Sequence, residues 1–252
     1  MTRRAAPFAA ALAAAAAIRL WVAATQTYAV FLDETFQYLE QAHRIVFGYA
    51  ILPWEYLEGL RSWLLPAALA LPMAAAAAVV DSPGFYIPAT RAACALLSLT
   101  VVWCAWRWGG RAGGPVAGAL AAAFSAVWFD TVWFAPAALT ETVAAHLALP
   151  ALCLLDRADR RRLAAAGILL GLAVCLRYQY GPPLAVGAAV ALRADWRAWL
   201  RLSAWGAATV ALGAGALDWA TWGAPFHSIL AHLRRNAGGG IATAMGVEAA
   251  TF

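Results

Sequence analysis

Long apolar runs, separated by short charged segments, constrain this chain more than any other feature. An α-helix needs about 20 mainly apolar residues to cross the hydrocarbon core of a bilayer, and the chain offers several such runs. Hydrophobic residues make up 64% of the sequence and charged residues 12%, whereas soluble domains have about 45 to 50% and about 25%. A water-soluble fold could not bury so much apolar surface. We therefore predict an all-α, polytopic transmembrane protein.

The membrane spans are predicted from these runs. The first run is interpreted as a span and not as a cleaved signal peptide, because Arg19 lies near its end and no small-residue cleavage site follows. The run over 63–80 contains Pro66 and Pro72 and is marginal in length, so we interpret it as a re-entrant or interfacial helix. We expect one membrane-embedded module over residues 1–252, with about seven spans at 5–25, 86–106, 115–134, 139–155, 163–180, 182–193 and 198–216.

Positive charge sets the predicted orientation, because cytoplasmic loops of membrane proteins carry an excess of lysine and arginine. If 63–80 does not cross, the arginine-rich segments all fall on the cytoplasmic side: Arg3 and Arg4, Arg107 and Arg111, the DRADRRR of 156–162, and Arg193 with Arg197. The opposite side, the periplasm of a bacterial inner membrane or the lumen of the endoplasmic reticulum, then receives the acids Asp33, Glu34, Glu55, Glu58, Glu141, Asp218 and Glu248. This distribution accounts for the net charge of +5 without a nucleic-acid partner.

Metal ligands are sparse in the sequence. The four cysteines lie inside apolar runs without metal-ligand spacing, and His43 and His146 have no second ligand nearby. An isolated Asp-Glu pair also has too few ligands for a dedicated site. We expect no metal and no cofactor.

The acidic residues are concentrated in the first external loop, predicted over 26–85. Asp33, Gln37, Gln41 and Arg44 recur at intervals of four and three residues, with apolar residues between them. This spacing predicts an amphipathic helix that lies on the membrane surface. The aromatic-rich segment 54–63 follows, and its tryptophans and tyrosine are typical of the interfacial belt.

An ordered set of motifs runs through this loop: Asp33-Glu34, Phe47-Gly48-Tyr49, Pro53-Trp54-Glu55 and Arg61-Ser62-Trp63. The set resembles the first external loop of the Alg9/PIG-B-like mannosyltransferases, glycosyltransferase family 22 of the membrane-embedded GT-C type. Weaker similarities follow at Glu141 in LTET, at Arg177 and Gln179 in LRYQY, and at Asp218 in DWATWG. The chain departs from the family pattern where Phe31-Leu32 replaces His-Pro, and the resemblance covers only the N-terminal half of a typical member. A partner that supplies the C-terminal half is therefore part of the expectation.

The resemblance implies a GT-C fold and transfer of a hexose, in that family mannose, from a polyprenyl or dolichyl phosphate donor to a glycan or glycolipid acceptor with inversion. An inverting displacement uses one carboxylate as the base. We assign this role to Asp33, with Glu34 as the second catalytic candidate that orients the acceptor. The anionic leaving group requires a cation. The candidates for substrate binding are Glu55, Arg61, Glu141, Arg177, Gln179, Asp218 and His227.

Other interpretations stay open at this level. Glu141 is also typical of an acid at a helix N-terminus, and Arg177 of a side chain that extends to the interface from a span end. A transporter or flippase is the main alternative function, but it would bury ionisable residues at mid-membrane and often in repeated halves. The acids here gather at one face without a repeat, which favours an enzyme. An inactive, truncated subunit of such an enzyme is the third hypothesis.

Overall fold

The computed structural model describes residues 6–26, 31–156, 159–193 and 195–237, and every regular element in these ranges is helical. Three helical segments are long and apolar enough to cross a membrane, and their bounds are Ala6–Thr25, Pro83–Val127 and Trp196–Trp222. Two shorter apolar helices, Leu64–Ala77 and Thr140–Leu154, accompany them. The prediction of an all-α membrane protein is confirmed.

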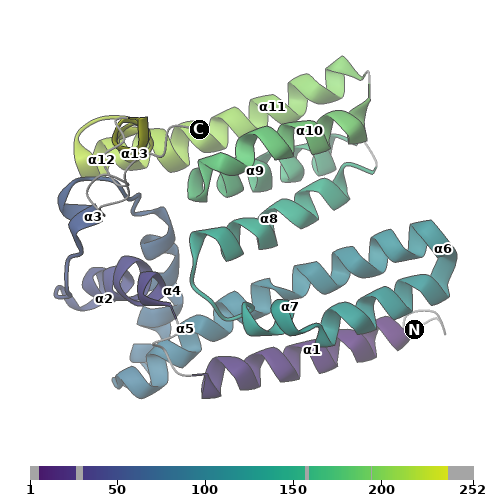
Figure 1. The fold of residues 1–252 in the computed structure, drawn as a ribbon, viewed down its shortest axis with the longest axis horizontal. Helices are drawn as coiled ribbons and strands as arrows, with labels where there is room; N and C mark the ends of the chain where they lie inside the picture. Colours follow the sequence, from purple (N-terminus) through teal and green to yellow (C-terminus); the bar gives the residue numbers. More distant parts are fainter. Residues whose placement is uncertain (1–5, 27–30, 157–158, 194, 238–252) are drawn as a thin grey trace, which may run out of the picture.

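The helices follow one another as α1 (Ala6–Thr25), η2 (Glu34–Leu39), α2 (Glu40–Phe47), α3 (Trp54–Leu57), α4 (Leu64–Ala77), α5 (Pro83–Leu97), α6 (Leu99–Val127), α7 (Phe129–Trp133), α8 (Thr140–Leu154), α9 (Arg160–Leu176), η3 (Tyr178–Tyr180), α10 (Gly181–Leu192), α11 (Trp196–Val210), η4 (Ala211–Ala216), α12 (Leu217–Trp222) and α13 (His227–Ala237). The segments η2 and η4 are π-helical and η3 is a 3₁₀ turn. Figure 1 shows the long helices side by side, with α2, α3, α12 and α13 together at one end.

Helix α6 folds back on itself, as Figure 1 shows. Its backbone leaves the helical conformation at Gly113 and Gly114, and Gly114 has a φ of +78°, which glycine adopts without the strain that a Cβ would add. Pro115 then starts the second limb. The break separates the segments predicted as spans 86–106 and 115–134.

The remaining predicted spans match helices closely. Segments 139–155, 163–180 and 182–193 correspond to α8, α9 and α10, and 198–216 corresponds to α11 with η4. Helices α9 and α11 approach closely at Gly167, where a Cβ would lie 2.6 Å from the carbonyl oxygen of Leu202. Small residues of this kind allow helix backbones to pack without lipid between them. The number of crossings stays a prediction.

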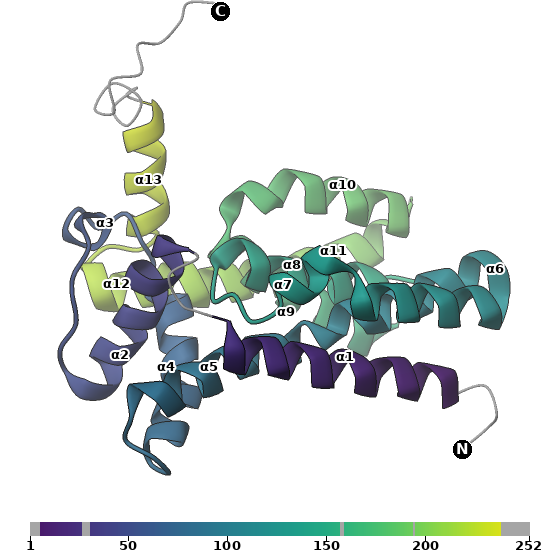
Figure 2. The ribbon, with the colours of Figure 1, turned by 60° about the horizontal axis from the view of Figure 1, so that its bottom comes forward.

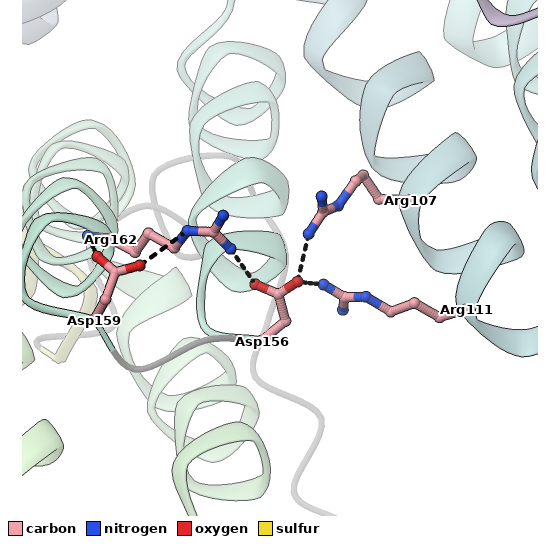
Figure 3. Close-up of polar contacts among 5 residues, drawn as sticks. All are labelled: Arg107, Arg111, Asp156, Asp159 and Arg162. Carbon is pink, nitrogen blue, oxygen red and sulfur yellow. Dashed lines mark hydrogen bonds and ion pairs between the residues drawn. The ribbon is translucent and has the colours of Figure 1, made fainter. Parts of the chain in front are cut away.

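The arginine-rich turns meet at the end of the bundle opposite to α2, α3 and α13. Asp156, at the end of α8, accepts from Arg107 and Arg111 of α6 and from Arg162 of α9 (Figure 3), the last at 3.1 Å. The α10–α11 turn lies at the same end (Figure 1). The described arginine segments therefore share one end, as predicted. Arg3, Arg4 and Glu248 lie outside the described residues, and the assignment of this end to the cytoplasm stays a prediction.

Within the predicted external loop over 26–85, the segments η2 and α2 pack on α4 of the same loop and contact α5 at Tyr86. Leu65, Leu69 and Met73 of α4 form a buried cluster with Tyr38 and Tyr86. Helix α4 spans only 14 residues, and its re-entrant or interfacial character stays a prediction.

The polar side of the predicted surface helix is only partly exposed. Asp33 and Arg44 are exposed, whereas Gln37 is 4% and Gln41 is 0% exposed. The Gln41 Nε2 donates to the carbonyl oxygens of Phe36 and Ile51, both at 2.8 Å. The segment after Gly48 covers this part of the helix. The side-chain amides therefore form hydrogen bonds inside the loop. That the helix lies on the membrane surface stays a prediction.

Candidate active site

A pocket of about 410 Å³ opens where the first loop meets the start of α8. We call it the carboxylate pocket, and its lining residues are Phe31, Leu32, Asp33, Tyr38, Arg61, Leu139 and Glu141. Asp33 directly precedes η2, Arg61 precedes α4, and Glu141 lies in the first turn of α8. Three segments that are far apart in the sequence thus bring two carboxylates and a guanidinium to one cavity.

Asp33 is held by an amide one turn further along the chain. The Gln37 Nε2 donates to Asp33 Oδ1 at 3.1 Å and to Glu55 Oε1 at 2.7 Å. Asp33 is exposed, while Gln37 is buried. The carboxylate is therefore fixed from its protein side and accessible to a ligand from the pocket, and Glu55 joins the site through the same amide.

A second, smaller pocket adjoins the first, since Tyr38 and Arg61 line both. Its volume is about 50 Å³, and Arg61, Arg177 and His232 bring three basic side chains to its wall; we call it the cation pocket. Gln179 and Tyr178 also line it. Arg177 Nη2 lies 2.9 Å from Glu141 Oε1, so an ion pair connects the two pockets.

Two buried tyrosines form hydrogen bonds to residues next to the candidate site. The Tyr38 hydroxyl lies 3.0 Å from Thr140 Oγ1, and the Tyr56 hydroxyl donates to the carbonyl oxygen of Gln37 at 2.9 Å. Burial raises the pKa of both Tyr38 and Tyr56 above the ordinary value. Both phenols are therefore neutral at physiological pH, and their hydrogen bonds fix Thr140, which precedes Glu141, and Gln37, which binds Asp33.

Comparison with known sequences identifies the protein family. A model of the Alg9-like mannosyltransferase family matches residues 10–194. The chain belongs to this family. The matched range contains the whole lining of the carboxylate pocket, together with Arg177 and Gln179 of the cation pocket. It ends before α11, so His232 lies outside it.

Short stretches of three mannosyltransferases are similar to this member of the family. The chain is 49% identical to GPI mannosyltransferase 3 of Drosophila melanogaster over 45 residues, which are 18% of this chain and 8% of that protein. It is 48% identical to GPI mannosyltransferase 3 of Trypanosoma brucei brucei over 54 residues, 21% of this chain and 10% of that protein. The protein of the same name from Yarrowia lipolytica is 59% identical over 34 residues, covering 14% and 7% of the two chains. Each alignment spans a tenth or less of the relative, and no solved structure matches.

Besides Glu55, which lines neither pocket and joins the site only through Gln37, three residues that the sequence suggested for this mannosyltransferase family member lie outside both pockets. Glu34 is 1% exposed, lies 3.0 Å from Arg91 Nε, and accepts from the Ala138 backbone nitrogen at 3.0 Å. Asp218 is fully buried and accepts from the backbone nitrogen and Oγ of Ser228, at 2.8 and 2.6 Å, at the start of α13. The two carboxylates therefore bind protein groups and connect distant segments.

His227 is the third. Its ring stacks on Trp222 with 5.8 Å between centroids, and it does not line either pocket. His232, one turn further along α13, lines the cation pocket in its place.

Sequence reasoning missed Arg91 and His232. Arg91 had a detectable signal, because a charged residue inside an apolar run needs a buried partner. His232 had none, since the sequence does not fix which side of α13 packs on the loop. The described part of the chain contains no group of three or more histidine, cysteine, aspartate or glutamate side chains arranged to hold a metal ion.

Proposed function

We propose that this protein is a membrane mannosyltransferase that transfers mannose from a polyprenyl or dolichyl phosphate to a hydroxyl of a glycan or glycolipid, with inversion. One observation carries the proposal: Asp33, Arg61 and Glu141 line the same pocket at one end of the helical bundle. Membership of the Alg9-like mannosyltransferase family supports the reaction class. The GPI mannosyltransferase 3 relatives support a lipid-linked acceptor.

The sugar is proposed to occupy the carboxylate pocket. Its volume of about 410 Å³ falls in the range of about 300 to 1,000 Å³ that is usual for small-molecule sites. Carboxylates accept hydrogen bonds from sugar hydroxyls, and Tyr38 adds an apolar ring surface. Glu141 is proposed to contact hydroxyl groups directly and Glu55, which does not line the pocket, to act through the Gln37 amide, while Asp33 faces the acceptor.

Asp33 is proposed as the general base. The acceptor oxygen attacks the anomeric carbon on the side opposite to the phosphate, its proton passes to the Asp33 carboxylate, and the carbon–oxygen bond to the phosphate breaks. The phosphate leaves with the electron pair. An exposed carboxylate held by the Gln37 amide is suited to accept this proton.

The leaving phosphate is proposed to lie against Arg61 and Arg177. Arg61 lines both pockets, so it stands between the sugar and its leaving group. Guanidinium groups placed where negative charge develops stabilise the transition state. Arg177 is held in place by Glu141. With this support the phosphate leaves without an acid catalyst, and we propose no cofactor beyond the lipid-linked donor.

Glu34 receives a positioning role in this proposal, in place of the predicted contact with the acceptor. Its carboxylate joins Arg91 of α5 to the backbone that leads into α8. That arrangement sets the distance between Asp33, its neighbour in sequence, and Glu141. Asp218 and His227 are likewise proposed to position α13.

The test is an assay of membranes that contain the chain, with radiolabelled polyprenyl-phosphate mannose and membranes without the chain as the control. We expect label to pass to a glycan or glycolipid product only when the chain is present, with a change of anomeric configuration. Retention of the anomeric configuration in the product would contradict a single displacement with Asp33 as base.

A further inference from the structure

His232 is the basic group of the cation pocket that the proposed reaction does not yet use. It projects from α13 toward Arg61, which precedes α4, and toward Arg177, at the end of α9. Its ring meets that of Tyr178 edge-on, with 5.8 Å between centroids. Figure 2 shows α13 standing beside α3, at the end of the bundle that carries the site.

Helix α13 is fixed in a way that aims His232 at the pocket. Buried Asp218 binds the backbone nitrogen and hydroxyl of Ser228. His232 lies four residues after Ser228 and so on the same side of the helix, and both residues line the cation pocket. On the neighbouring side, Arg235 pairs with Glu58 at 3.0 Å. Two contacts therefore hold the helix over the pocket.

The pocket has more positive than negative charge around it. Arg177 has Glu141 as a partner, whereas neither Arg61 nor His232 has a carboxylate within ion-pair distance in the described ranges. The Arg61 Nε is buried and without a hydrogen-bond partner in the same ranges. Burial, followed by the charges of Arg61 and Arg177, lowers the pKa of His232 below the ordinary histidine value. An anion in this pocket would offset the excess positive charge, accept a hydrogen bond from the Arg61 Nε and favour the protonated form of His232.

The size of the pocket limits the anion. Its volume of about 50 Å³ is a few times the roughly 10 to 15 Å³ that a single water molecule needs. The cation pocket is the smaller of the two and has room for a small anion beside its basic side chains. The adjoining carboxylate pocket, at about 410 Å³, has the room for the sugar. A sugar phosphate bound here would place its sugar in the carboxylate pocket and its phosphate in the cation pocket, with Arg61 between them.

We propose that His232 is a phosphate-binding residue of the donor site and that it takes up a proton from solvent when the phosphodiester of the lipid-linked sugar binds between Arg61 and Arg177. This inference rests on the proposed function for the identity of the ligand. The charged and titratable groups that line the cation pocket together with the imidazole are Arg61, Arg177, Tyr38, Tyr178 and Cys175.

The proposal has a defined pH dependence. Without ligand, His232 is neutral at pH 7, because its pKa lies below the ordinary value. A bound phosphodiester raises that pKa, so donor binding tightens as pH falls and weakens as pH rises through the pKa of the complex. The donor itself contributes no slope, because a phosphodiester keeps one negative charge across this range.

The experiment measures donor binding by the detergent-purified full chain in the absence of acceptor, from pH 5.5 to 8.5, by titration calorimetry. The probe is a short-chain polyprenyl phosphomannose. Comparison of two buffers with different ionisation enthalpies gives the protons taken up on binding. The variants are His232→Gln, which cannot become charged, and His232→Arg, which keeps its charge. His43→Gln is the matched control, because His43 bonds Tyr86 outside the pockets.

We expect proton uptake and a pH-dependent Kd in the wild type and in His43→Gln. In His232→Gln the uptake should vanish and the Kd at low pH should rise about tenfold, the usual worth of one hydrogen bond to a charged group. In His232→Arg binding should stay tight and independent of pH. Thermal unfolding verifies that both proteins are folded. Equal proton uptake by folded His232→Gln and wild type would overturn the inference about His232 and leave the proposed function standing. Failure of the wild type to bind the donor at any pH would overturn the proposed function with it.

Discussion

Arg91 Nε lies 3.0 Å from Glu34 Oε1, and both side chains are 1% exposed. The guanidinium also donates to the backbone carbonyl and side-chain oxygens of Gln26, at the end of α1. Glu34 binds the backbone of Ala138 as well. One buried ion pair thus joins the end of α1, the Asp-Glu motif, α5 and the segment before α8. Asp33 and Glu141 are placed by that junction.

The first prediction concerns this ion pair. Glu34→Gln should lower the free energy of unfolding by about 3 to 5 kcal/mol, because the buried guanidinium loses its counter-charge. The double variant Glu34→Leu with Arg91→Met should recover part of that loss, since an apolar pair leaves no uncompensated charge. Thermal unfolding in detergent measures both effects. A stable, fully folded Glu34→Gln protein without activity would contradict the positioning role and support Glu34 as a catalytic residue.

The second prediction concerns Asp33. Asp33→Asn keeps the size of the side chain and removes the proton acceptor, so mannosyl transfer should fall by about 10² to 10⁴-fold. Donor affinity should stay close to that of the wild type, because the proposed phosphate site is the neighbouring cation pocket. The matched control is Asp81→Asn, an exposed carboxylate in the turn before α5. Near-normal turnover by Asp33→Asn would show that another carboxylate is the base.

The third prediction concerns Arg177. Arg177→Met should weaken donor binding and also lower the rate of transfer, because the guanidinium pairs with Glu141 and, in the proposed mechanism, stabilises the leaving phosphate. Arg177→Lys should restore only part of the rate, since an ammonium group cannot make the same paired contacts. Steady-state kinetics with varied donor separate the two effects. Unchanged kinetics in Arg177→Met would remove this residue from the site.

The fourth prediction concerns sidedness. All four native cysteines are buried, so a single introduced thiol can be labelled selectively. An impermeant maleimide added from outside should react with Leu57→Cys, which replaces a side chain that is 70% exposed near the site. It should reach Arg160→Cys, at the arginine-rich end, only after the membrane is permeabilised. Labelling of Arg160→Cys in intact membranes would reverse the predicted orientation.

The fifth prediction concerns the opposite end of the bundle. Asp156 is the shared partner of Arg107, Arg111 and Arg162, as Figure 3 shows. Asp156→Asn should reduce stability by about 1 to 2 kcal/mol, because three partly exposed ion pairs are lost together. The difference from wild type should shrink at high ionic strength, since salt screens such pairs. Unfolding at two salt concentrations measures it, and transfer activity should be unaffected.

Much of the candidate site could be predicted from the sequence. The order of motifs in the first loop indicated Asp33 and Arg61, and the later similarities indicated Glu141, Arg177 and Gln179; the structure brings all five to two adjoining pockets. The apolar runs and the arginine-rich turns likewise predicted the helices and the common end of the charged turns. These features depend on local composition, because an apolar run in the hydrocarbon core must form a helix to satisfy its backbone groups, and positively charged turns stay on one side of the membrane.

Tertiary structure decided which of the candidate residues on one segment faces the site. Asp33 and Glu34 are adjacent, and successive side chains on a helix point in different directions. Glu34 is drawn into the interior by Arg91, which lies 57 residues away in the sequence. His227 and His232 both belong to α13, and only the packing of this helix over the first loop turns His232 toward Arg61. The sequence by itself determined a helical membrane protein with a set of candidate residues; contacts between distant segments decided which of them meet, because those contacts fix the orientation of each helix.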